Sequence, residues 1–182
     1  ARAMREIILP TVRGMEKDGI PYTGFLYAGL MIDAQGKPKA LEFNCRMGDP
    51  ETQPILMRLK SDLLEVLAAA IDGKLDALEL QWDRRTALGV VMAAHGYPDQ
   101  PRKGDAINGL PPEADDAMVF HAGTALDEAG VLRTSGGRVL CVTVLADNVR
   151  QAQQRAYDVA RGIHFDGVQY RRDIGHRAVR ST

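Results

Sequence analysis

The chain has 182 residues, 45% of them hydrophobic, and its 23 Lys and Arg against 24 Asp and Glu leave a formal net charge of −1. This length can bury a core and divide into two small lobes, and a content of 26% charged residues excludes the fibrous and disordered classes. The balanced charge and an aromatic content of 5% argue against a nucleic-acid partner, and no apolar run approaches the roughly 20 residues that cross a membrane.

The two cysteines, Cys45 and Cys141, are too few for a disulfide framework and lack the clustered spacing of a zinc site. We therefore expect two buried, reduced thiols. No charged-then-apolar signal segment opens the chain, which predicts a cytoplasmic location. The chain starts at Ala1, without an initiator Met and inside a helical pattern, so we expect that it is cut from a longer protein.

The first predicted element is a helix, in which Pro10 should interrupt the apolar pattern and Asp18-Gly19 should end it. The apolar run of residues 24–32 then predicts a central strand that is covered on both faces. Turn-forming residues 33–37 lead to a second run, residues 39–45, so the two strands should form an antiparallel hairpin.

The second strand of this hairpin predicts a metal site. Alternate residues share a face, which gives one face with Ala40, Glu42, Asn44 and Arg46 and another with Leu41, Phe43 and Cys45. Glu42 and Asn44 are about 6.6 Å apart along the strand, so their oxygens can converge on one hard cation such as Mg²⁺. Arg46 would then bind a phosphoryl oxygen. The alternative is the solvent face of an edge strand, although the apolar neighbouring strand favours a cleft.

Residues 47–52 predict a turn into a helix, with Asp49 as the cap, Pro50 at the first helical position and an irregular first turn at Pro54. The helix start suits an anion, whereas Asp49 and Glu51 suit an ammonium group or sugar hydroxyls. The alternative is that Asp49 only caps the helix and Glu51 only interacts with the helix dipole.

The rest of the chain predicts a helix and then a small β-rich lobe. This helix should begin with a capping box at residues 62–65 and end before Gly73. Three apolar runs (87–94, 118–122 and 139–145) should form strands, covered by an amphipathic helix over residues 149–163 with Asp147 as its cap. We expect a hairpin turn at residues 135–137, although a glycine turn followed by Arg138 also suits a phosphate. Residues 171–173 should belong to a solvated basic tail.

Several segments along the chain carry a resemblance to a known family, namely PYTGFLYAGLMID, LEFNCRMGDPETQP, LGVVMAAHGYP, VFHAGT and TSGGRVLCVT. They resemble the phosphoribosylamine-glycine ligase (glycinamide ribonucleotide synthetase) family of the ATP-grasp superfamily, and the resemblance covers nearly the whole chain. It implies an α+β fold: residues 1–83 would be the C-terminal part of an ATP-grasp antiparallel sheet with helices. Residues 84–182 would be a small C-terminal β-rich lobe covered by one helix.

The resemblance also implies an activity, namely the ligation of glycine to phosphoribosylamine with ATP and Mg²⁺ or Mn²⁺ in purine biosynthesis. The products would be glycinamide ribonucleotide, ADP and phosphate, formed through a glycyl phosphate. Glu42 and Asn44 match the metal pair of the family, and Arg46 matches a residue that steadies the transferred phosphoryl group. The substrate-side loop of the family matches Gly48, Asp49, Pro50 and Glu51.

The sequence leaves open a third metal ligand and two alternative functions. Many ATP-grasp enzymes have a further acidic ligand on the preceding strand, where this chain has residues 29–31 without a carboxylate. Either two protein ligands suffice, or another comes from the missing N-terminal part, without which we expect the chain to be inactive. Two alternative functions are a related ligase for a different acid and amine, and a non-catalytic module that docks onto a partner domain.

Overall fold

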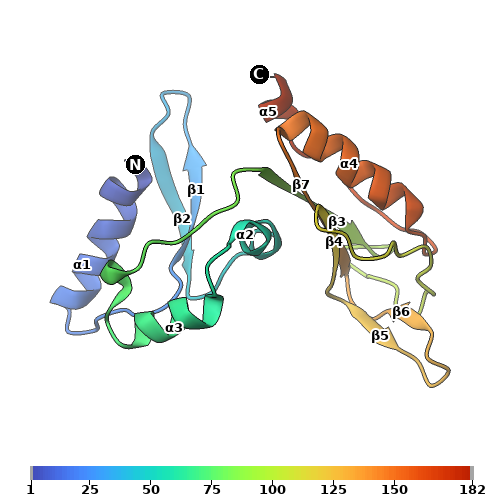
Figure 1. Ribbon diagram of the computed structural model, residues 1–182, viewed down its shortest axis with the longest axis horizontal. Helices are drawn as coiled ribbons and strands as arrows, with labels where there is room; N and C mark the ends of the chain where they lie inside the picture. The colour runs from blue at the N-terminus through green and yellow to red at the C-terminus, as the bar shows by residue number, and fades with distance from the viewer. Residues whose placement is uncertain (1, 181–182) are drawn as a thin grey trace. The chain divides into compact units, whose positions relative to one another are not determined.

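The computed structural model describes residues 2–180. These residues fall into two compact units: those up to Asp49 with Ser61–Glu79, and Pro50–Lys60 with those from Leu80 onward. Both units combine helices with antiparallel strands, which confirms the mixed α and β class (Figure 1). None of the helices within 2–180 is long and apolar enough to cross a membrane.

The first unit starts with a π-helical segment, η1 (Met4–Ile8), which continues directly into helix α1 (Leu9–Lys17). Pro10 lies at the start of α1, where its missing N–H does the least harm to the helical hydrogen bonds. At the predicted interruption, the chain therefore changes from π-helical to α-helical hydrogen bonds, and the helix does not break. The predicted end is confirmed, because Asp18 is the C-cap and Gly19 takes a φ of 78°.

The predicted capping of the next helix in this unit, α3 (Leu63–Ile71), is also confirmed. A side-chain oxygen of Asp62 accepts hydrogen bonds from the backbone N–H groups of Leu64 and Glu65, at 2.7 and 3.3 Å. Gly73, with a φ of 68°, follows the C-cap, and a short 3₁₀ helix, η2 (Leu75–Ala77), comes next.

Strands β1 (Tyr27–Ile32) and β2 (Pro38–Asn44) form the predicted antiparallel hairpin. The prediction that β1 is a central strand is wrong for the described residues, since its sheet contains only these two strands. Met31 and Ile32 are accordingly more than half exposed, at 56% and 57%. An apolar run indicates that both faces of a strand can be buried. Whether they are buried depends on other elements that pack on those faces.

The second unit contains an antiparallel sheet in the order β3-β7-β4, formed by β3 (Thr86–Ala93), β7 (Arg138–Ala146) and β4 (Ala117–His121). These are the three predicted strands. Helix α4 (Val149–Gly162) packs on one face. Its cap is Asn148 and not Asp147 as predicted, because Asn148 has the extended backbone of an N-cap and accepts a hydrogen bond from Gln151 N–H at 3.0 Å.

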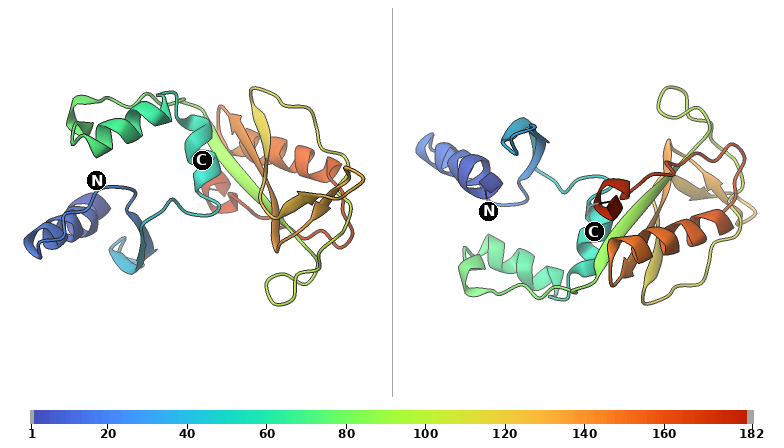
Figure 2. Two further views of the ribbon diagram at one scale, coloured as in Figure 1. Left: turned by 90° about the horizontal axis from the view of Figure 1, so that it is seen from below. Right: turned by 90° about the horizontal axis from the view of Figure 1, so that it is seen from above.

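The buried core lies between α4 and this sheet. Apolar side chains from β3, β7 and α4 make up its centre: Leu88, Val90, Met92, Leu140, Val142, Val144, Ala152, Ala156, Val159 and Ala160. Helix α2 (Thr52–Arg58) packs on the opposite face, where a Cβ on Gly89 would lie 3.2 Å from Pro54 Cγ. Figure 2 shows α2 and α4 on opposite sides of β3. We call the surface opposite α4 the α2 face; it carries Gly89, Val91, Ala93 and Cys141.

Two short strands that sequence patterns did not indicate, β5 (Thr124–Leu126) and β6 (Leu132–Thr134), form a second hairpin. Its turn is stabilised by Asp127, whose carboxylate accepts hydrogen bonds from Ala129 N–H and Val131 N–H. Residues 135–137 connect β6 to β7, so the predicted hairpin turn at this position is wrong. A five-residue helix, α5 (His176–Arg180), comes last.

Candidate functional site

The predicted metal pair lies on one face of β2. Glu42 and Asn44 face Gly29 and Tyr27 across the hairpin, and Asn44 Nδ2 donates a hydrogen bond to Glu42 Oε1 at 3.3 Å. A β-bulge at Leu41 shifts the alternation, so Ala40, which lies opposite Leu30, belongs to the other face. The prediction that Ala40 shares the face of Glu42 is therefore wrong. That Glu42 and Asn44 share one face is confirmed.

Gly29 makes room for the side chain of Glu42. A Cβ at this position would lie 2.9 Å from Glu42 Cγ, which is closer than real side chains approach. The carboxylate of Glu42 thus extends across the neighbouring strand, where it meets the amide of Asn44. Both strands of the hairpin contribute to the position of this carboxylate.

The oxygen atoms of this pair fit two neighbouring positions around a hard cation. A half-turn of the Asn44 amide exchanges its nitrogen and oxygen, which would place two oxygens about as far apart as the present 3.3 Å. Adjacent ligands on Mg²⁺, at bonds of about 2.1 Å, lie about 3.0 Å apart. Within residues 2–180, no cluster of three or more His, Cys, Asp or Glu could hold a metal ion.

Arg46 lies beyond the end of β2, in a bend, and its side chain is exposed. Its Nη1 donates a hydrogen bond to the carbonyl oxygen of the next residue, Met47, at 3.1 Å. The strand alternation that would align Arg46 with Glu42 stops at Asn44, so the prediction that Arg46 lies on the same strand face is wrong. Cys45 is exposed, contrary to the prediction, whereas Cys141 is buried.

The loop after this bend differs from the predicted helix start. Gly48 is buried, Asp49 and Glu51 are exposed, and α2 begins only at Thr52. The N-cap residue is Glu51, without a side-chain cap hydrogen bond, so the prediction of Asp49 as the cap and Pro50 as the first helical residue is wrong. The reason is Pro54, which has no N–H to donate to Pro50; the first such bond runs from Ile55 N–H to Glu51 O at 3.2 Å.

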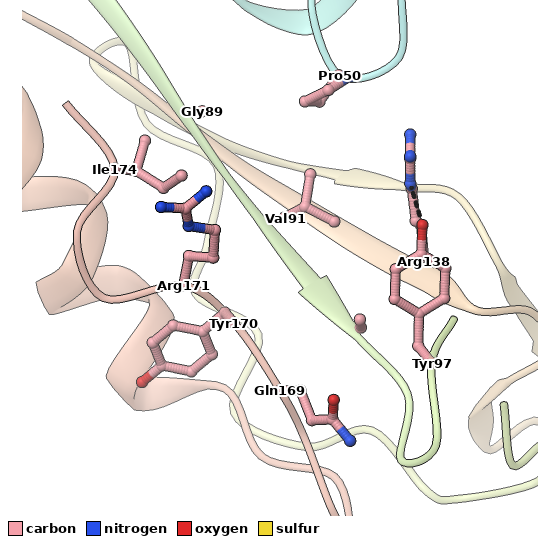
Figure 3. Close-up of a pocket in the computed structure, with 10 residues that line it drawn as sticks. Pro50, Gly89, Val91, Tyr97, Arg138, Gln169, Tyr170, Arg171 and Ile174 are labelled. Atoms are coloured by element: carbon pink, nitrogen blue, oxygen red, sulfur yellow. Dashed lines mark hydrogen bonds between the residues drawn. The ribbon is translucent and has the colours of Figure 1, made fainter. Parts of the chain in front are cut away.

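A pocket of about 490 Å³ opens on the α2 face of the second unit, and we call it the β3 pocket (Figure 3). Its lining comprises Pro50, Gly89, Val91, Ala93, Tyr97, Arg138, Gln169, Tyr170, Arg171 and Ile174. In Figure 3, Arg171 and Ile174 lie on one side of β3, and Tyr97 and Arg138 lie on the other. Pro50 is the only member of the predicted substrate loop among these residues.

A β-bulge in β7 determines the direction of Arg138. Met92 lies opposite Leu140, whereas the next residue of β3, Ala93, lies opposite Arg138, so Val139 is the extra residue. Regular alternation would turn Arg138 toward the apolar core, but the bulge turns it to the face that carries Ala93. Val139 is fully buried instead.

Tyr97 holds this arginine in place. Arg138 Nε donates a hydrogen bond to Tyr97 Oη at 2.8 Å, and the guanidinium carbon lies 5.9 Å from the centre of the Tyr97 ring. The ring packs against Gly137, where a Cβ would lie 2.5 Å from Tyr97 Cδ2. Gly137 thus provides the space for Tyr97, which explains this glycine without a bound phosphate.

Arg171 is held by Asp173 on the other side of the pocket. Its Nε and Nη2 donate hydrogen bonds to the two carboxylate oxygens of Asp173, at 2.9 and 2.7 Å. These hydrogen bonds raise the pKa of Arg171 and lower the pKa of Asp173. Arg171 is therefore part of a pocket wall, whereas the sequence analysis placed it only in a solvated basic tail.

Sequence reasoning missed most of the β3 pocket. Two signals for this pocket were present in the sequence. One is the pair of small residues on the same face of β3, Gly89 and Ala93, and the other is Arg138, which follows two glycines. Tyr97, Gln169 and Tyr170 come from loops that no periodic pattern brings together.

A second, more basic hollow of about 790 Å³ lies where the chain enters β3, between Arg58, Trp82, Arg84 and Arg85. Asp83, between Trp82 and Arg84 in the sequence, binds two of these arginines: Arg85 donates hydrogen bonds to both of its carboxylate oxygens, and Arg58 donates to its backbone oxygen. The Arg85 guanidinium holds the pKa of Asp83 well below its usual range. These contacts fasten the segment before β3 to α2.

Comparisons with known proteins match both units. The family model "Phosphoribosylglycinamide synthetase, C domain" matches residues 87–177, and the model "Phosphoribosylglycinamide synthetase, ATP-grasp (A) domain" matches residues 1–52. The phosphoribosylamine-glycine ligase of Ralstonia nicotianae is 72% identical over 99% of this chain, and that of Neisseria meningitidis serogroup A is 58% identical over 98%.

A solved structure agrees with these matches. The crystal structure of phosphoribosylamine-glycine ligase from Thermotoga maritima has a TM-score of 0.80 and 40% sequence identity over 94% of this chain. This chain spans 42% of the length of that protein and of both curated relatives. The C-domain match alone covers half of the residues, from β3 to α5. The chain therefore belongs to the phosphoribosylglycinamide synthetase family.

Proposed function

We propose that this chain is part of a ligase that joins glycine to phosphoribosylamine with ATP, giving glycinamide ribonucleotide, ADP and phosphate. The observation that carries the proposal is the pairing of Glu42 and Asn44 on one face of β2, within the residues that match the ATP-grasp domain. The names of the relatives support the same reaction. As predicted from the sequence, the reaction would take place in the cytoplasm in purine biosynthesis.

Glu42 and Asn44 would hold Mg²⁺ or Mn²⁺, and a divalent cation at this site would neutralise phosphate charge. Their side chains are kept together by the hairpin and by the space at Gly29. The exposed guanidinium of Arg46 would steady the transferred phosphoryl group, although it lies outside the strand. Asp49 and Glu51 are exposed carboxylates that suit an ammonium group or sugar hydroxyls, in a loop that Gly48 and Pro50 complete.

The reaction has two steps. A carboxylate oxygen of glycine attacks the γ-phosphorus of ATP, and ADP leaves with the electrons of the broken bond. The amine of phosphoribosylamine then attacks the glycyl carbonyl carbon and loses a proton, and phosphate leaves. Both steps need groups placed on either side of the reacting atoms.

The β1–β2 hairpin would be part of the ATP-grasp antiparallel sheet, and we retain 1–83 and 84–182 as the proposed limits of the two domains. Because the chain spans 42% of its relatives' length, we propose that the other nucleotide-binding groups come from sequence that those relatives have and this chain lacks. The chain alone would then be inactive.

The test uses a chimera in which this chain replaces the matching part of the Ralstonia nicotianae relative, which is 72% identical. We expect the chimera to release ADP only with glycine, phosphoribosylamine and Mg²⁺. The Glu42→Gln variant should lose turnover by about 100-fold or more, because it loses an anionic ligand.

The matched control is Glu128→Gln, which removes an exposed carboxylate far from β2 in the sequence and should leave turnover unchanged. Near-normal activity of Glu42→Gln would contradict the metal assignment. A folded chimera that uses other acids or amines would indicate a different ligase, and one that releases no ADP would favour a docking module.

A further inference from the structure

We propose that the β3 pocket binds the phosphate group of a phosphorylated sugar, with Arg138 as the ligand of the phosphate and Arg171 as a second cation of the same pocket. The identity of the sugar phosphate as phosphoribosylamine rests on the function proposed above. What is new is that the phosphate would bind to the second unit. The residues of this pocket do not include the predicted metal pair, and Pro50 is the one residue that they share with the predicted substrate loop.

The charges that line the pocket favour an anion. Two guanidinium groups contribute to the lining, and no carboxylate does. Asp173 compensates part of the charge of Arg171 by binding Nε and Nη2, but Nη1 has no partner within the described residues. The same two hydrogen bonds orient the Arg171 guanidinium, while its side chain stays 71% exposed and accessible to a ligand.

The orientation of Arg138 is a second, independent observation. The extra residue Val139 turns Arg138 out of the core face, and the hydroxyl and ring of Tyr97 hold it at the pocket. Bulges that redirect one side chain are common next to functional sites. The bulge and the hydrogen bond from Arg138 to Tyr97 together direct the guanidinium to the pocket and away from the core.

The floor of the pocket suits the carbon skeleton of a small sugar. Gly89, Val91 and Ala93 present a small, apolar surface along one strand, with the arginines on either side. The volume of about 490 Å³ is in the range of small-molecule sites. A phosphate ester carries up to two negative charges, which suits a pocket lined by two cations better than the single charge of a carboxylate.

The first experiment measures binding to the intact 182-residue chain by calorimetric and NMR titration with ribose 5-phosphate. We expect binding of ribose 5-phosphate and none of ribose, with shifts at Gly89, Val91 and Tyr97. The Arg138→Met variant should weaken binding about 10- to 100-fold, because a charge-assisted hydrogen-bond donor is lost. Tyr97→Phe should give a smaller loss, since the arginine remains but is less well positioned.

Arg150→Met is the matched control, because Arg150 is exposed on α4 and does not line the pocket. If Arg138→Met fails to fold, Arg138→Lys replaces it and should still weaken binding, because lysine cannot donate two parallel hydrogen bonds. Equal affinity for ribose and ribose 5-phosphate, tighter binding of ADP, or no binding of any of them would overturn the proposal.

The chimera separates this proposal from the proposed function. There, Arg138→Met should raise the KM for phosphoribosylamine about 10-fold or more, while the KM for ATP and the metal dependence stay unchanged. An active chimera whose KM values are insensitive to Arg138 would refute the pocket alone. An inactive chimera whose second unit still binds ribose 5-phosphate through Arg138 would refute the proposed reaction alone.

Discussion

At the scale of single residues, the site depends on a glycine as much as on its polar side chains. Glu42 and Asn44 share a face because they are two apart on a strand, which the sequence predicts directly. Gly29 leaves the space that Glu42 occupies, with a Cβ-to-Cγ distance of only 2.9 Å if a side chain were added. That requirement depends on which residues face each other across the hairpin.

Gly29→Ala should therefore weaken the binding of a divalent cation without changing the ligands. In the chimera, we expect the Mg²⁺ concentration for half-maximal activity to rise about tenfold, because Glu42 must move, with most activity recovered at saturating Mg²⁺. The control is Gly14→Ala in α1, where an added Cβ meets nothing within 4 Å. An unchanged Mg²⁺ titration would show that the position of Glu42 does not matter.

At the scale of helices and strands, both candidate sites lie next to β-bulges, at Leu41 in β2 and at Val139 in β7. The bulge in β2 puts Ala40 on the other face from Glu42, and the bulge in β7 turns Arg138 to the α2 face. Neither bulge is visible in the sequence pattern. Some helix ends behave differently, because their signals are local. Asp62 and Gly73 delimit α3 as the sequence predicts, whereas the N-caps of α2 and α4 are not the predicted residues.

Asp62→Ala should destabilise α3 by about 1 kcal/mol, because two backbone N–H groups lose their acceptor. Amide hydrogen exchange of residues 64–70 should become correspondingly faster. Asp62→Asn is the matched control and should stay within a few tenths of a kcal/mol of the wild-type chain, since asparagine caps about as well. Equal exchange rates in the alanine variant would mean that the cap contributes nothing.

At the scale of the whole molecule, ion pairs make stability depend on pH. Hydrogen bonds from Arg85, Arg133 and Arg171 lower the pKa values of Asp83, Asp127 and Asp173, respectively. At acid pH the unfolded chain, with ordinary aspartate pKa values near 3.9, therefore binds more protons than the folded chain. The stabilisation is present above about pH 4 and is lost as the pH falls toward the lowered values.

Urea unfolding followed by circular dichroism should show a midpoint that is nearly constant from pH 7 to about pH 5 and falls progressively below about pH 4. Asp83→Asn should lower the midpoint at pH 7 and flatten its decline in acid, because the group with the most strongly lowered pKa is gone. Glu128→Asn, at an exposed turn position, serves as the control. A midpoint independent of pH in the wild-type chain would contradict the ion-pair argument.

Features that follow from short-range rules can be predicted from the sequence. Strand runs, helix ends at Asp62 and Gly73, and the shared face of Glu42 and Asn44 depend on residues within a few positions of each other. The family resemblance was also readable in the sequence, and the matches to both domain models confirm it.

Which strand positions face each other and which loops meet is visible only in the folded chain. In it, Ala40 lies on the other face from Glu42, Arg138 points to a pocket, and Arg171 lines the opposite side of the same pocket. The physical reason is that one extra residue in a strand costs little locally but reverses the faces of the residues beyond it. Which register is adopted is decided by packing between segments far apart in the chain, and no local pattern records that packing.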